Sequence, residues 1–255
     1  MRIHPTAVVS EKARLGPGVL LGPYSVVEDE VEIGEGTEIR AHAIVKRFTV
    51  LGAGNVLHKG SIVGGEPQDV AFNGAESRLL IGHRNRIREN VTIHRASKPG
   101  ASTVVGSDSF IMAGAHVAHD CRLGDGVILA NNVALAGHVQ IDDRAFLSGG
   151  VVVHQFCRIG RIAMIGGNSK IVQDCLPFVT TDGAPGRACG LNLIGLRRSG
   201  AKAADIQVLK KAYRLLLRSG LSLEESLAEI SHLDHHLASE LIAFVAGSTR
   251  GFCHE

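Results

Sequence analysis

The stretch AHVAHDCRLGDGVILANNVALAGHV, residues 115–139, combines a strict spacing of aliphatic residues with a cluster of histidines. Val117, Leu123, Leu129 and Leu135 follow one another in steps of six. Such regularity is typical of a structural repeat, in which each unit contributes one side chain to a continuous core. Polar residues set into a repeat of this kind are therefore the first candidates for chemistry.

The spacing of six extends far beyond this stretch. Of the 29 positions taken in steps of six from residue 3 to residue 171, 26 hold Ile, Val or Leu. The three exceptions are Asp69, Ala75 and Pro99. They fall in two segments, near 64–77 and 95–103, whose Gly, Pro and Asn residues favour turns. We predict that both segments are loops projecting from a regular body, and loops on a rigid scaffold commonly carry function.

The repeating unit is an aliphatic residue, often followed by glycine and, four positions after the aliphatic, by a small residue. This pattern resembles the hexapeptide repeat of left-handed parallel β-helices. The resemblance implies that three hexads form one triangular coil, with the aliphatic side chain inside. Glycine would ease the tight corner turns, where positive φ is common. The predicted fold class is mainly β: a left-handed parallel β-helix of hexapeptide repeats with a C-terminal α-helical domain.

The hexads stop before Pro177. We expect the β-helix to occupy residues 1–176. An irregular connector rich in glycine and proline should follow at 177–200, and a helical domain at 201–255.

The expected helical domain has clear start and stop signals. From Ala203 the apolar spacing becomes helical, and Gly220 ends that pattern. Ser222 and Glu225 have the spacing of a capping box that opens a second helix. A third helix is expected over roughly His236–Ala246.

The composition supports a core of small aliphatic side chains, since 45% of residues are hydrophobic, only 4% are aromatic and 31 are glycine. A net charge of +2 gives no reason to expect nucleic-acid binding. The five cysteines form no CxxC pair, which favours free thiols in a reducing compartment. No apolar run is long enough to span a membrane, and the repeat begins at Ile3, leaving no room for a signal peptide. We therefore expect a cytoplasmic protein.

A period of three hexads places side chains in columns. Residues separated by one such coil lie next to each other at about 4.8 Å, the interstrand spacing of a sheet. His119 then shares a column with Gly137 and Gln155, and Asp120 shares the next column with His138. Two histidines, a carboxylate and an open glycine backbone are thus predicted to meet at one corner.

This corner has the groups that direct acyl transfer requires. A histidine with a pKa of about 6.5 can take a proton from an attacking hydroxyl. Asp120 can hold His119 in one tautomer, and the N–H of Gly137 can stabilise an oxyanion. No serine or cysteine is placed for a covalent intermediate, because Cys121 occupies a small, inward position. We therefore favour direct transfer.

Other interpretations stand beside this one. A single histidine at a β-helix corner is more often solvated surface, and His94 and His154 are ambiguous by themselves. A metal-dependent lyase of the γ-carbonic anhydrase type would use His116, His119 and His138 as zinc ligands. A third possibility is a binding module without chemistry. The convergence of four polar groups favours a catalytic site that needs no metal and no other cofactor.

Five short motifs distinguish this chain from hexapeptide proteins in general: GHRNRIRENVTIHR (82–95), HVAHDC (116–121), LANNVALAGH (129–138), VHQFC (153–157) and STRG (248–251). With them the chain resembles, over nearly its whole length, the acyl-carrier-protein-dependent UDP-N-acetylglucosamine O-acyltransferases of lipid A biosynthesis. The resemblance implies transfer of a 3-hydroxyacyl chain from acyl carrier protein to a UDP-sugar. It also implies a homotrimer with active sites between neighbouring prisms.

The resemblance assigns roles to individual residues. His119 matches the general base that deprotonates the sugar 3-hydroxyl, Asp120 its support, and Gly137 the oxyanion amide. Gly167 matches the position that sets acyl length, where glycine leaves the groove open for a longer chain. The matches to substrate contacts are His116, His138 and His154 for the sugar and acyl site, Gln155, Asn192 and Arg198 for the nucleotide, and Asp69 for the glucosamine.

Three positions depart from the family pattern. Ala71 stands where a lysine is common, Ser199 where an arginine is thought to meet the phosphates, and Ile194 where a glutamate is expected near the uracil. These changes lie outside the corner, so they bear on the acceptor and leave open a UDP-sugar with a 3-amino group. A paralogous N-acyltransferase of a later step fits less well, because the hexads leave no separate N-terminal uridine-binding domain. Basic residues around 197–211 are expected to attract the carrier protein.

Overall fold

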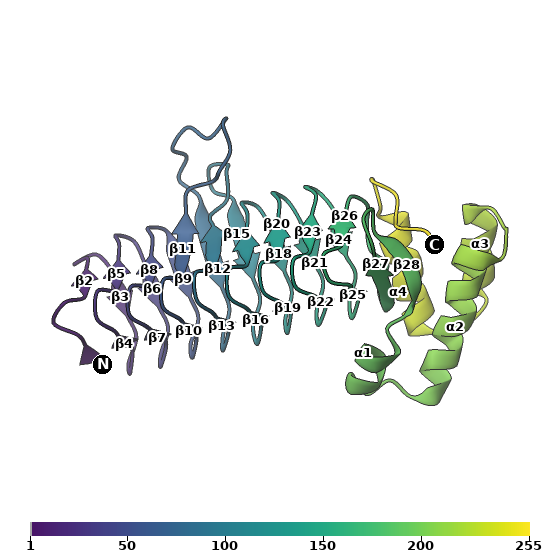
Figure 1. Cartoon of the computed structure of the whole chain (residues 1–255), viewed down its shortest axis with the longest axis horizontal. Helices are drawn as coiled ribbons and strands as arrows, with labels where there is room; N and C mark the ends of the chain where they lie inside the picture. The colour runs from purple at the N-terminus through teal and green to yellow at the C-terminus, as the bar shows by residue number, and fades with distance from the viewer. Residues whose placement is uncertain (1) are drawn as a thin grey trace.

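The computed structural model describes residues 2–255 and shows a long three-sided prism with a group of helices at its C-terminal end (Figure 1). Short strands run around the prism and pair in parallel with strands of the neighbouring coils. The three faces are sheets, which we call A, B and C. The predicted fold class, a left-handed parallel β-helix of hexapeptide repeats with a helical C-terminal region, is confirmed.

The strands are short, most of them two residues long, because each face of the prism accommodates only one short strand per hexad. Sheet A has eleven strands: β1 (Arg2–Ile3), β4 (Leu20–Leu21), β7 (Glu38–Ile39), β10 (Val56–Leu57), β13 (Arg86–Ile87), β16 (Phe110–Ile111), β19 (Ile128–Leu129), β22 (Phe146–Leu147), β25 (Met164–Ile165), β27 (Val179–Asp182) and β28 (Arg187–Leu191). Sheet B has nine: β2 (Val8–Val9), β5 (Val26–Val27), β8 (Ile44–Val45), β11 (Ile62–Gly65), β14 (Thr92–His94), β17 (His116–Val117), β20 (Ala134–Leu135), β23 (Val152–Val153) and β26 (Lys170–Ile171). Sheet C has eight: β3 (Arg14–Leu15), β6 (Glu32–Ile33), β9 (Thr49–Leu51), β12 (Arg78–Ile81), β15 (Ser102–Val105), β18 (Arg122–Leu123), β21 (Gln140–Ile141) and β24 (Arg158–Ile159).

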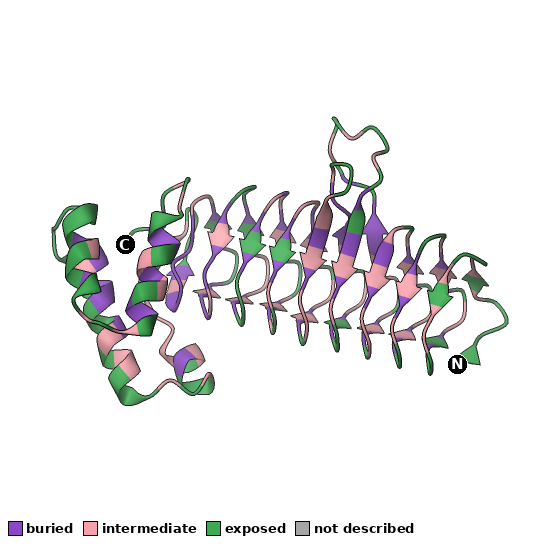
Figure 2. Ribbon diagram, turned by 180° about the vertical axis from the view of Figure 1, so that it is seen from behind, coloured by how far each residue is buried: buried purple, intermediate pink, exposed green. Residues whose placement is uncertain are grey.

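The core of the prism is a stack of aliphatic side chains. Every Ile, Val or Leu at the spacing of six from Leu21 to Ile171 is buried (Figure 2). Outside the loops the register between coils is three hexads, as in the pairing of Leu129 with Leu147. Full burial of one such side chain contributes about 1.5–3 kcal/mol, so the repeat builds a continuous core without large aromatic residues.

The glycines that follow the aliphatic residues serve close packing between coils. The expectation that they adopt positive φ is wrong except at Gly64. A Cβ added to Gly34 would lie 2.5 Å from the carbonyl carbon of Gly52, so the neighbouring coil leaves no room for a side chain. Positive φ occurs elsewhere in the corner turns, for example at Asp120 (60°) and His138 (62°). Two residues of the predicted corner thus have a backbone conformation that is uncommon outside glycine.

Both projecting loops lie on the edge where sheet B passes into sheet C, which we call the B–C edge. Residues 66–77 join β11 to β12, and residues 95–101 join β14 to β15. The first of these loops stands well out from the prism (Figure 1). The turn 118–121 joins β17 to β18 and therefore lies on the same edge.

Residues 177–200 contain ordered elements that the sequence did not reveal. The strands β27 and β28 form an antiparallel hairpin, and β27 pairs with β25 of the prism. The helix α1 (Leu193–Arg198) follows, capped by Asn192, whose Oδ1 accepts a hydrogen bond from the Gly195 N–H at 2.9 Å. The high glycine and proline content predicted an irregular segment, but Gly183, with φ of 101°, permits the turn of the hairpin.

The C-terminal helices are α2 (Ala203–Arg218), α3 (Leu223–Ser231) and α4 (His236–Ala246), close to the predicted positions. The capping box is present: the Ser222 N–H donates to Glu225 Oε2 at 2.9 Å, and the Glu225 N–H donates to Ser222 Oγ at 3.2 Å. Arg161 of the prism donates two hydrogen bonds to Glu240 of α4, at 2.7 and 2.6 Å. Within residues 2–255, no helix is long and apolar enough to cross a lipid bilayer.

Candidate active site

The four residues that the repeat period places in adjacent columns meet on the B–C edge. His119 and Asp120 lie in the turn between β17 and β18, while Gly137 and His138 lie in the equivalent turn of the next coil. The His138 N–H donates to the carbonyl oxygen of His119 at 3.0 Å and so joins the two turns. We call these four residues the histidine corner.

The carboxylate of Asp120 organises this corner. Its Oδ2 lies 2.8 Å from His119 Nδ1 and 3.7 Å from His138 Nε2. The same oxygen accepts hydrogen bonds from the Ser97 N–H at 3.1 Å and the Ser97 hydroxyl at 2.7 Å. With Nδ1–H of His119 donated to Asp120, the Nε2 atom of His119 keeps a lone pair that can accept a proton.

The electrostatics of the corner keep Asp120 ionised. Burial alone raises the pKa of its carboxyl group, but the hydrogen bonds from Ser97 and His119 lower it by more, so the pKa lies below its usual value. The side chains of His119 and Asp120 are 14% and 11% exposed, which shields the pair from water while leaving an opening for a substrate. A negative carboxylate in this position stabilises the positive charge that His119 acquires when it takes a proton.

Glycine is the only residue type that this corner admits at position 137. A Cβ there would lie 2.6 Å from His119 Cε1 and 2.8 Å from Nε2, so any side chain would displace the imidazole. Among residues 2–255, no backbone carbonyl accepts a hydrogen bond from the Gly137 N–H. A free backbone donor beside the Nε2 atom of His119 is the arrangement needed to stabilise an oxyanion next to a general base.

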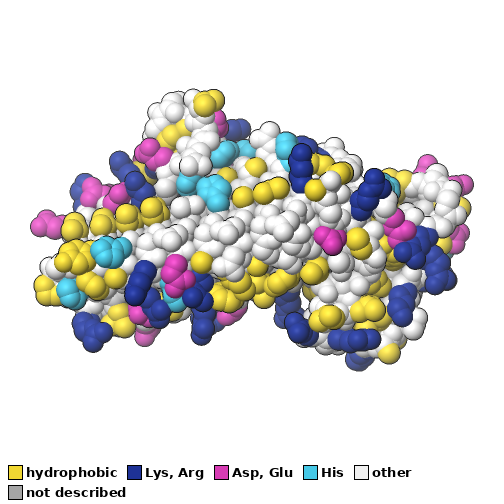
Figure 3. Space-filling view, viewed as in Figure 1, with side chains coloured by type: hydrophobic (Ala, Val, Ile, Leu, Met, Phe, Trp, Pro, Cys, Tyr) yellow, Lys and Arg dark blue, Asp and Glu magenta, His cyan; other side chains and the backbone are white. Residues whose placement is uncertain are grey.

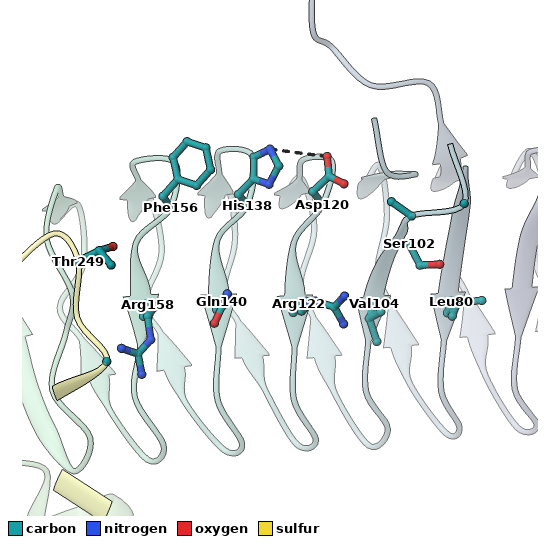
Figure 4. Close-up of a pocket in the computed structure, with 13 residues that line it drawn as sticks. Leu80, Ser102, Val104, Asp120, Arg122, His138, Gln140, Phe156, Arg158 and Thr249 are labelled. Carbon is teal, nitrogen blue, oxygen red and sulfur yellow. Dashed lines mark ion pairs between the residues drawn. The ribbon is translucent and has the colours of Figure 1, made fainter. Parts of the chain in front are cut away.

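A groove of about 850 Å³ runs beside the corner along sheet C (Figure 4). Its lining includes three residues of the turns and three of the strands: Asp120, His138 and Phe156, and Arg122, Gln140 and Arg158. The His138 ring stacks on Phe156 with ring centroids 4.6 Å apart. Two residues of the histidine corner, Asp120 and His138, therefore border a space large enough for a small-molecule substrate, whereas His119 and Gly137 are not among its lining residues.

Two further histidines form an uncharged neighbourhood next to His119. Burial lowers the pKa of His94 to about 4, with His116 and His119 adding to the effect. Burial also lowers the pKa of His116, whose Nδ1 lies 2.7 Å from Thr92 Oγ1. Both rings are consequently neutral near pH 7, so neither adds a positive charge beside His119.

Three other residues that the resemblance implicates lie on or near the B–C edge without joining the corner. His154 and Gln155 are exposed, and His154 Nδ1 lies 3.2 Å from the carbonyl oxygen of Gln155. Asp69 sits in the projecting loop, where its Oδ1 accepts a hydrogen bond from the Ala71 N–H at 2.9 Å. Histidine side chains gather beneath this loop (Figure 3).

The remaining implicated residues lie on other faces of the same chain. Asn192 and Arg198 line a second groove, of about 920 Å³, against sheet A. The amide of Asn192 is engaged locally, since its Nδ2 donates to the Ile162 carbonyl oxygen at 2.8 Å while its Oδ1 caps α1. Gly167 follows β25 and precedes β26, which places it on the edge between sheets A and B. One chain alone therefore does not bring these residues to His119.

The structure also bears on the zinc alternative. His119, Asp120 and His138 have ligand atoms that all lie within 4.8 Å of one another, whereas His116 is not in that group. The set proposed from the sequence, with three histidines, is therefore not the one that converges. Asp120 Oδ2 already serves His119 and Ser97, so the geometry fits an acid–base pair better than a zinc site.

Cys121 is fully buried beside the corner, and burial raises the pKa of its thiol to about 12. A neutral, buried thiol is not a nucleophile at physiological pH. This agrees with the inward, packing role inferred from the sequence and with transfer that needs no covalent intermediate.

Comparison with known proteins can now be set beside this geometry. The family described as "Udp N-acetylglucosamine O-acyltransferase; Domain 2" matches residues 174–253, and the bacterial transferase hexapeptide (six repeats) matches residues 2–47 and 102–137. The acyl-[acyl-carrier-protein]--UDP-N-acetylglucosamine O-acyltransferase of Alkalilimnicola ehrlichii is 51% identical over 253 residues, 98% of either chain. This chain belongs to the same acyltransferase family.

Two more members of the UDP-N-acetylglucosamine O-acyltransferase family extend the comparison. The one from Gloeothece citriformis is 48% identical over 176 residues, which are 69% of this chain and 64% of that relative, so this match spans less than two thirds of its length. The crystal structure of the enzyme from Moraxella catarrhalis RH4 superposes with a TM-score of 0.95 at 38% identity and covers 100% of both chains. The family resemblance drawn from the five motifs is confirmed.

Ser97 is the member of the site that the sequence did not reveal. It lies 23 positions before Asp120, because the loop 95–101 adds residues to the regular coil of three hexads. Counting in columns therefore could not place it. The only available signal was a hydroxyl residue in a loop expected to carry function.

Proposed function

We propose that the protein transfers a 3-hydroxyacyl chain from acyl carrier protein to the 3-hydroxyl of UDP-N-acetylglucosamine, the first step of lipid A biosynthesis. The observation that carries this proposal is the His119–Asp120 pair, joined at 2.8 Å, with the imidazole lying against the open backbone of Gly137. Family members with 45–51% identity over nearly the full chain carry the name of this activity.

The chemistry follows from the roles of three residues. His119 Nε2 removes the proton from the sugar 3-hydroxyl as the oxygen attacks the thioester carbonyl. The Gly137 N–H stabilises the resulting oxyanion, while Asp120 stabilises the protonated His119. Collapse of the intermediate breaks the C–S bond, completes the ester, and passes the proton from His119 to the departing thiolate. Atoms and charges balance without a cofactor.

The substrate-contact residues extend this proposal. His116, His138 and His154 line the sugar and acyl site, and Asp69 meets the glucosamine from the projecting loop. Gln155, Asn192 and Arg198 contact the nucleotide. Gly167 leaves the acyl groove open; a Cβ at this position would be in ordinary van der Waals contact with the Gly149 carbonyl oxygen at 3.5 Å, so a larger side chain would occupy space that glycine leaves free.

The active unit we propose is a homotrimer. The outward side chains of sheet B carry no charge from β2 to β23, at Val8, Val26, Ile44, Ile62, Thr92, His116, Ala134 and Val152. A band of hydrophobic side chains runs along the prism (Figure 3). A continuous uncharged face of this length favours association with another copy. A neighbouring prism would also bring Asn192, Arg198 and Gly167, which lie on other faces, to a histidine corner.

Two features support the proposed partner and compartment. Basic residues extend from α1 into α2, including Arg197, Arg198, Lys202, Lys210 and Lys211, and an acidic carrier protein would be attracted to them. All five cysteines are free, which suits a reducing cytoplasm.

The family comparison does not favour the alternatives drawn from the sequence. Ile194 and Ser199 line the second groove, so their departures bear on nucleotide affinity and leave the histidine corner intact. An acceptor with a 3-amino group would use the same corner. A lyase would require a metal at a site where Asp120 is already engaged.

The most direct test is mass spectrometry of the product formed from UDP-N-acetylglucosamine and a series of 3-hydroxyacyl carrier proteins of increasing length. The expected product is a 3-O-ester with one preferred acyl length. A parallel assay with the 3-amino analogue of this UDP-sugar tests the N-acylated alternative, and hydroxylamine, which cleaves esters and leaves amides intact, distinguishes the two products. No transfer to UDP-N-acetylglucosamine, or preferential transfer to the 3-amino analogue, would contradict the proposal.

Loss of the general base gives the second test. We expect His119→Ala to lower kcat by several hundred-fold or more, in line with removal of a general base. His4→Ala, at an exposed position in the first coil, is the control and should leave kcat unchanged. Circular dichroism should show both variants folded; near-wild-type turnover by His119→Ala would remove His119 from its role.

A further inference from the structure

Arg95 is a buried cation at the base of the projecting loop. It directly follows β14, and its side chain is only 3% exposed. Arginine is almost never buried to this degree unless it is paired with other groups. The contacts that surround Arg95 therefore indicate what it holds.

The guanidinium of Arg95 contacts the loop 66–77 at two points. Its Nη2 lies 3.3 Å from Glu66 Oε1, at the first residue of the loop. Its Cζ lies 5.4 Å from the ring centroid of Phe72, in the middle of the loop, and 5.4 Å from that of Phe48 below. The Arg95 N–H also donates to the Gly65 carbonyl oxygen at 2.9 Å. One side chain thus fixes the start and the centre of the loop against the prism.

The two residues after Arg95 continue this connection to the histidine corner. Ala96 holds the far end of the loop, since its N–H donates to the Arg78 carbonyl oxygen at 3.2 Å and its own carbonyl accepts from the Ser77 hydroxyl. Ser97 then donates twice to Asp120. Three consecutive residues therefore link both ends of the loop to the carboxylate that orients His119.

The arrangement is not one that maximises stability. Among residues 2–255, Nε and Nη1 of Arg95 have no hydrogen-bond partner, and its one carboxylate partner, Glu66, is 65% exposed. A buried charge that is only partly paired costs free energy, and an apolar side chain of similar size is often neutral or stabilising in its place. A buried, partly paired arginine that contacts the loop 66–77 therefore suggests that its role is to hold this loop in place.

We propose that Arg95 is a positioning residue that clamps the loop 66–77, and with it Asp69, over the histidine corner. The clamp sets how the sugar is held and leaves proton transfer at His119 unchanged. This inference rests on the proposed function, because it takes Asp69 as a contact to the glucosamine. The mobility of the loop, however, can be measured without any substrate.

The first measurement is hydrogen–deuterium exchange of the intact protein, comparing wild type with Arg95→Lys, Arg95→Met and Glu66→Gln. We expect amides of the loop 66–77 to exchange at least about tenfold faster in the Arg95 variants, since local opening governs exchange in such segments. Glu66→Gln should show a smaller increase. Arg84→Met is the matched control, because Arg84 pairs with Asp108 outside this loop and its loss should leave loop exchange unchanged.

The second measurement separates KM from kcat in the same variants. In Arg95→Met we expect the KM for UDP-N-acetylglucosamine to rise about tenfold or more, while kcat at saturation stays within about threefold of wild type. The KM for the acyl carrier protein should not change. Arg95→Lys, which keeps the charge but loses the planar stacking group, should recover part of the loss.

Several outcomes would overturn the clamp. Unchanged loop exchange in Arg95→Met would do so, and so would a fall in kcat at constant KM, which would show that Arg95 acts on the histidine corner. Should Arg95→Met fail to fold, Arg95→Lys and Glu66→Gln carry the same comparison. If the wild-type protein shows no turnover of UDP-N-acetylglucosamine, the proposed function fails, while loop exchange still decides whether Arg95 is a clamp.

Discussion

At the scale of single residues, the site depends on one carboxylate oxygen. Asp120 Oδ2 receives His119 Nδ1–H and both donors of Ser97, and these contacts keep the carboxyl group ionised despite its burial. A hydrogen bond to a charged group is worth about 1.5–3 kcal/mol. Ser97, which touches no reacting atom in our proposal, should therefore still influence the rate through Asp120.

We predict that Ser97→Ala lowers kcat/KM about tenfold, the effect of losing a hydrogen bond to a charged group. The hydroxyl hydrogen bond of Ser97 lowers the pKa of Asp120, so its loss raises that pKa, although the backbone N–H of residue 97 still donates to Asp120 in the variant. Asp120 must be ionised, so activity should disappear at a higher pH as the solution is acidified. The measurement is the acidic limb of the kcat/KM profile against pH.

Ser97→Thr keeps the hydroxyl and serves as the control, with an acidic limb close to wild type. A wild-type rate and an unshifted limb in Ser97→Ala would show that the His119 contact alone fixes Asp120.

The positions of the histidine-corner residues were predictable because they follow from the repeat period alone. His119 and Gly137, or Asp120 and His138, are separated by one coil of three hexads, and stacked coils bring them together whatever their side chains. The contacts of Ser97 and Arg95 were not predictable, because they cross loops of irregular length. Loop conformation depends on local hydrogen bonds that no periodicity records.

At the scale of elements, each short strand contributes one inward aliphatic side chain, and each coil packs only on its neighbours. Leu135 of β20 is fully buried and lies in the coil that supplies Gly137 and His138. Stability in such a repeat is roughly a sum of local terms and interfaces between neighbouring units. A cavity in one coil should therefore destabilise that coil and its contacts with neighbouring coils, and so lower the stability of the whole prism.

We predict that Leu135→Ala lowers the free energy of unfolding by about 2–5 kcal/mol, the cost of a large-to-small change in a core. Urea denaturation at fixed protein concentration measures it. Gln140→Ala, at an exposed position on the following strand, should change stability by less than about 0.5 kcal/mol. Equal effects of the two variants would contradict a continuous aliphatic core.

The elements themselves were predictable to different degrees. The helices α2, α3 and α4 carry helical periodicity and, at Ser222, a capping box. The hairpin of β27 and β28 and the short helix α1 are too brief for a periodic signal, and their order comes from pairing with β25 and from the Asn192 cap. Tertiary contacts decide such segments more than local propensity does.

At the scale of the whole molecule, the prism presents three chemically different faces. The outward positions of sheet C include the charged residues Arg14, Glu32, Arg122 and Arg158, whereas those of sheet B from β2 to β23 are uncharged. Burying the uncharged face is favourable and burying the charged one is not. The proposed trimer should therefore depend on sheet B.

We predict that wild-type protein behaves in light scattering as three copies of the 26.9 kDa chain, about 81 kDa, and that Ile44→Asp on sheet B shifts it to smaller species. A buried, unpaired carboxylate at an interface is costly, which gives the variant its effect. Val50→Asp, one hexad later on sheet C, is the matched control and should remain trimeric. A monomeric wild type, or loss of the trimer only in Val50→Asp, would contradict this choice of face.

Because three hexads complete one coil, the face on which a residue lies depends on how many hexads precede it. Removing one complete coil before the loop 66–77 would shorten the prism by about 4.8 Å and return every later residue to its own edge. Removing a single hexad between that loop and the turn 118–121 would instead rotate everything downstream by one face. The histidine corner would survive intact but would point away from Asp69. Insertions and deletions in this scaffold are therefore tolerated when they add or remove one complete coil of three hexads. Insertions or deletions of any other length move the residues after them to a different face.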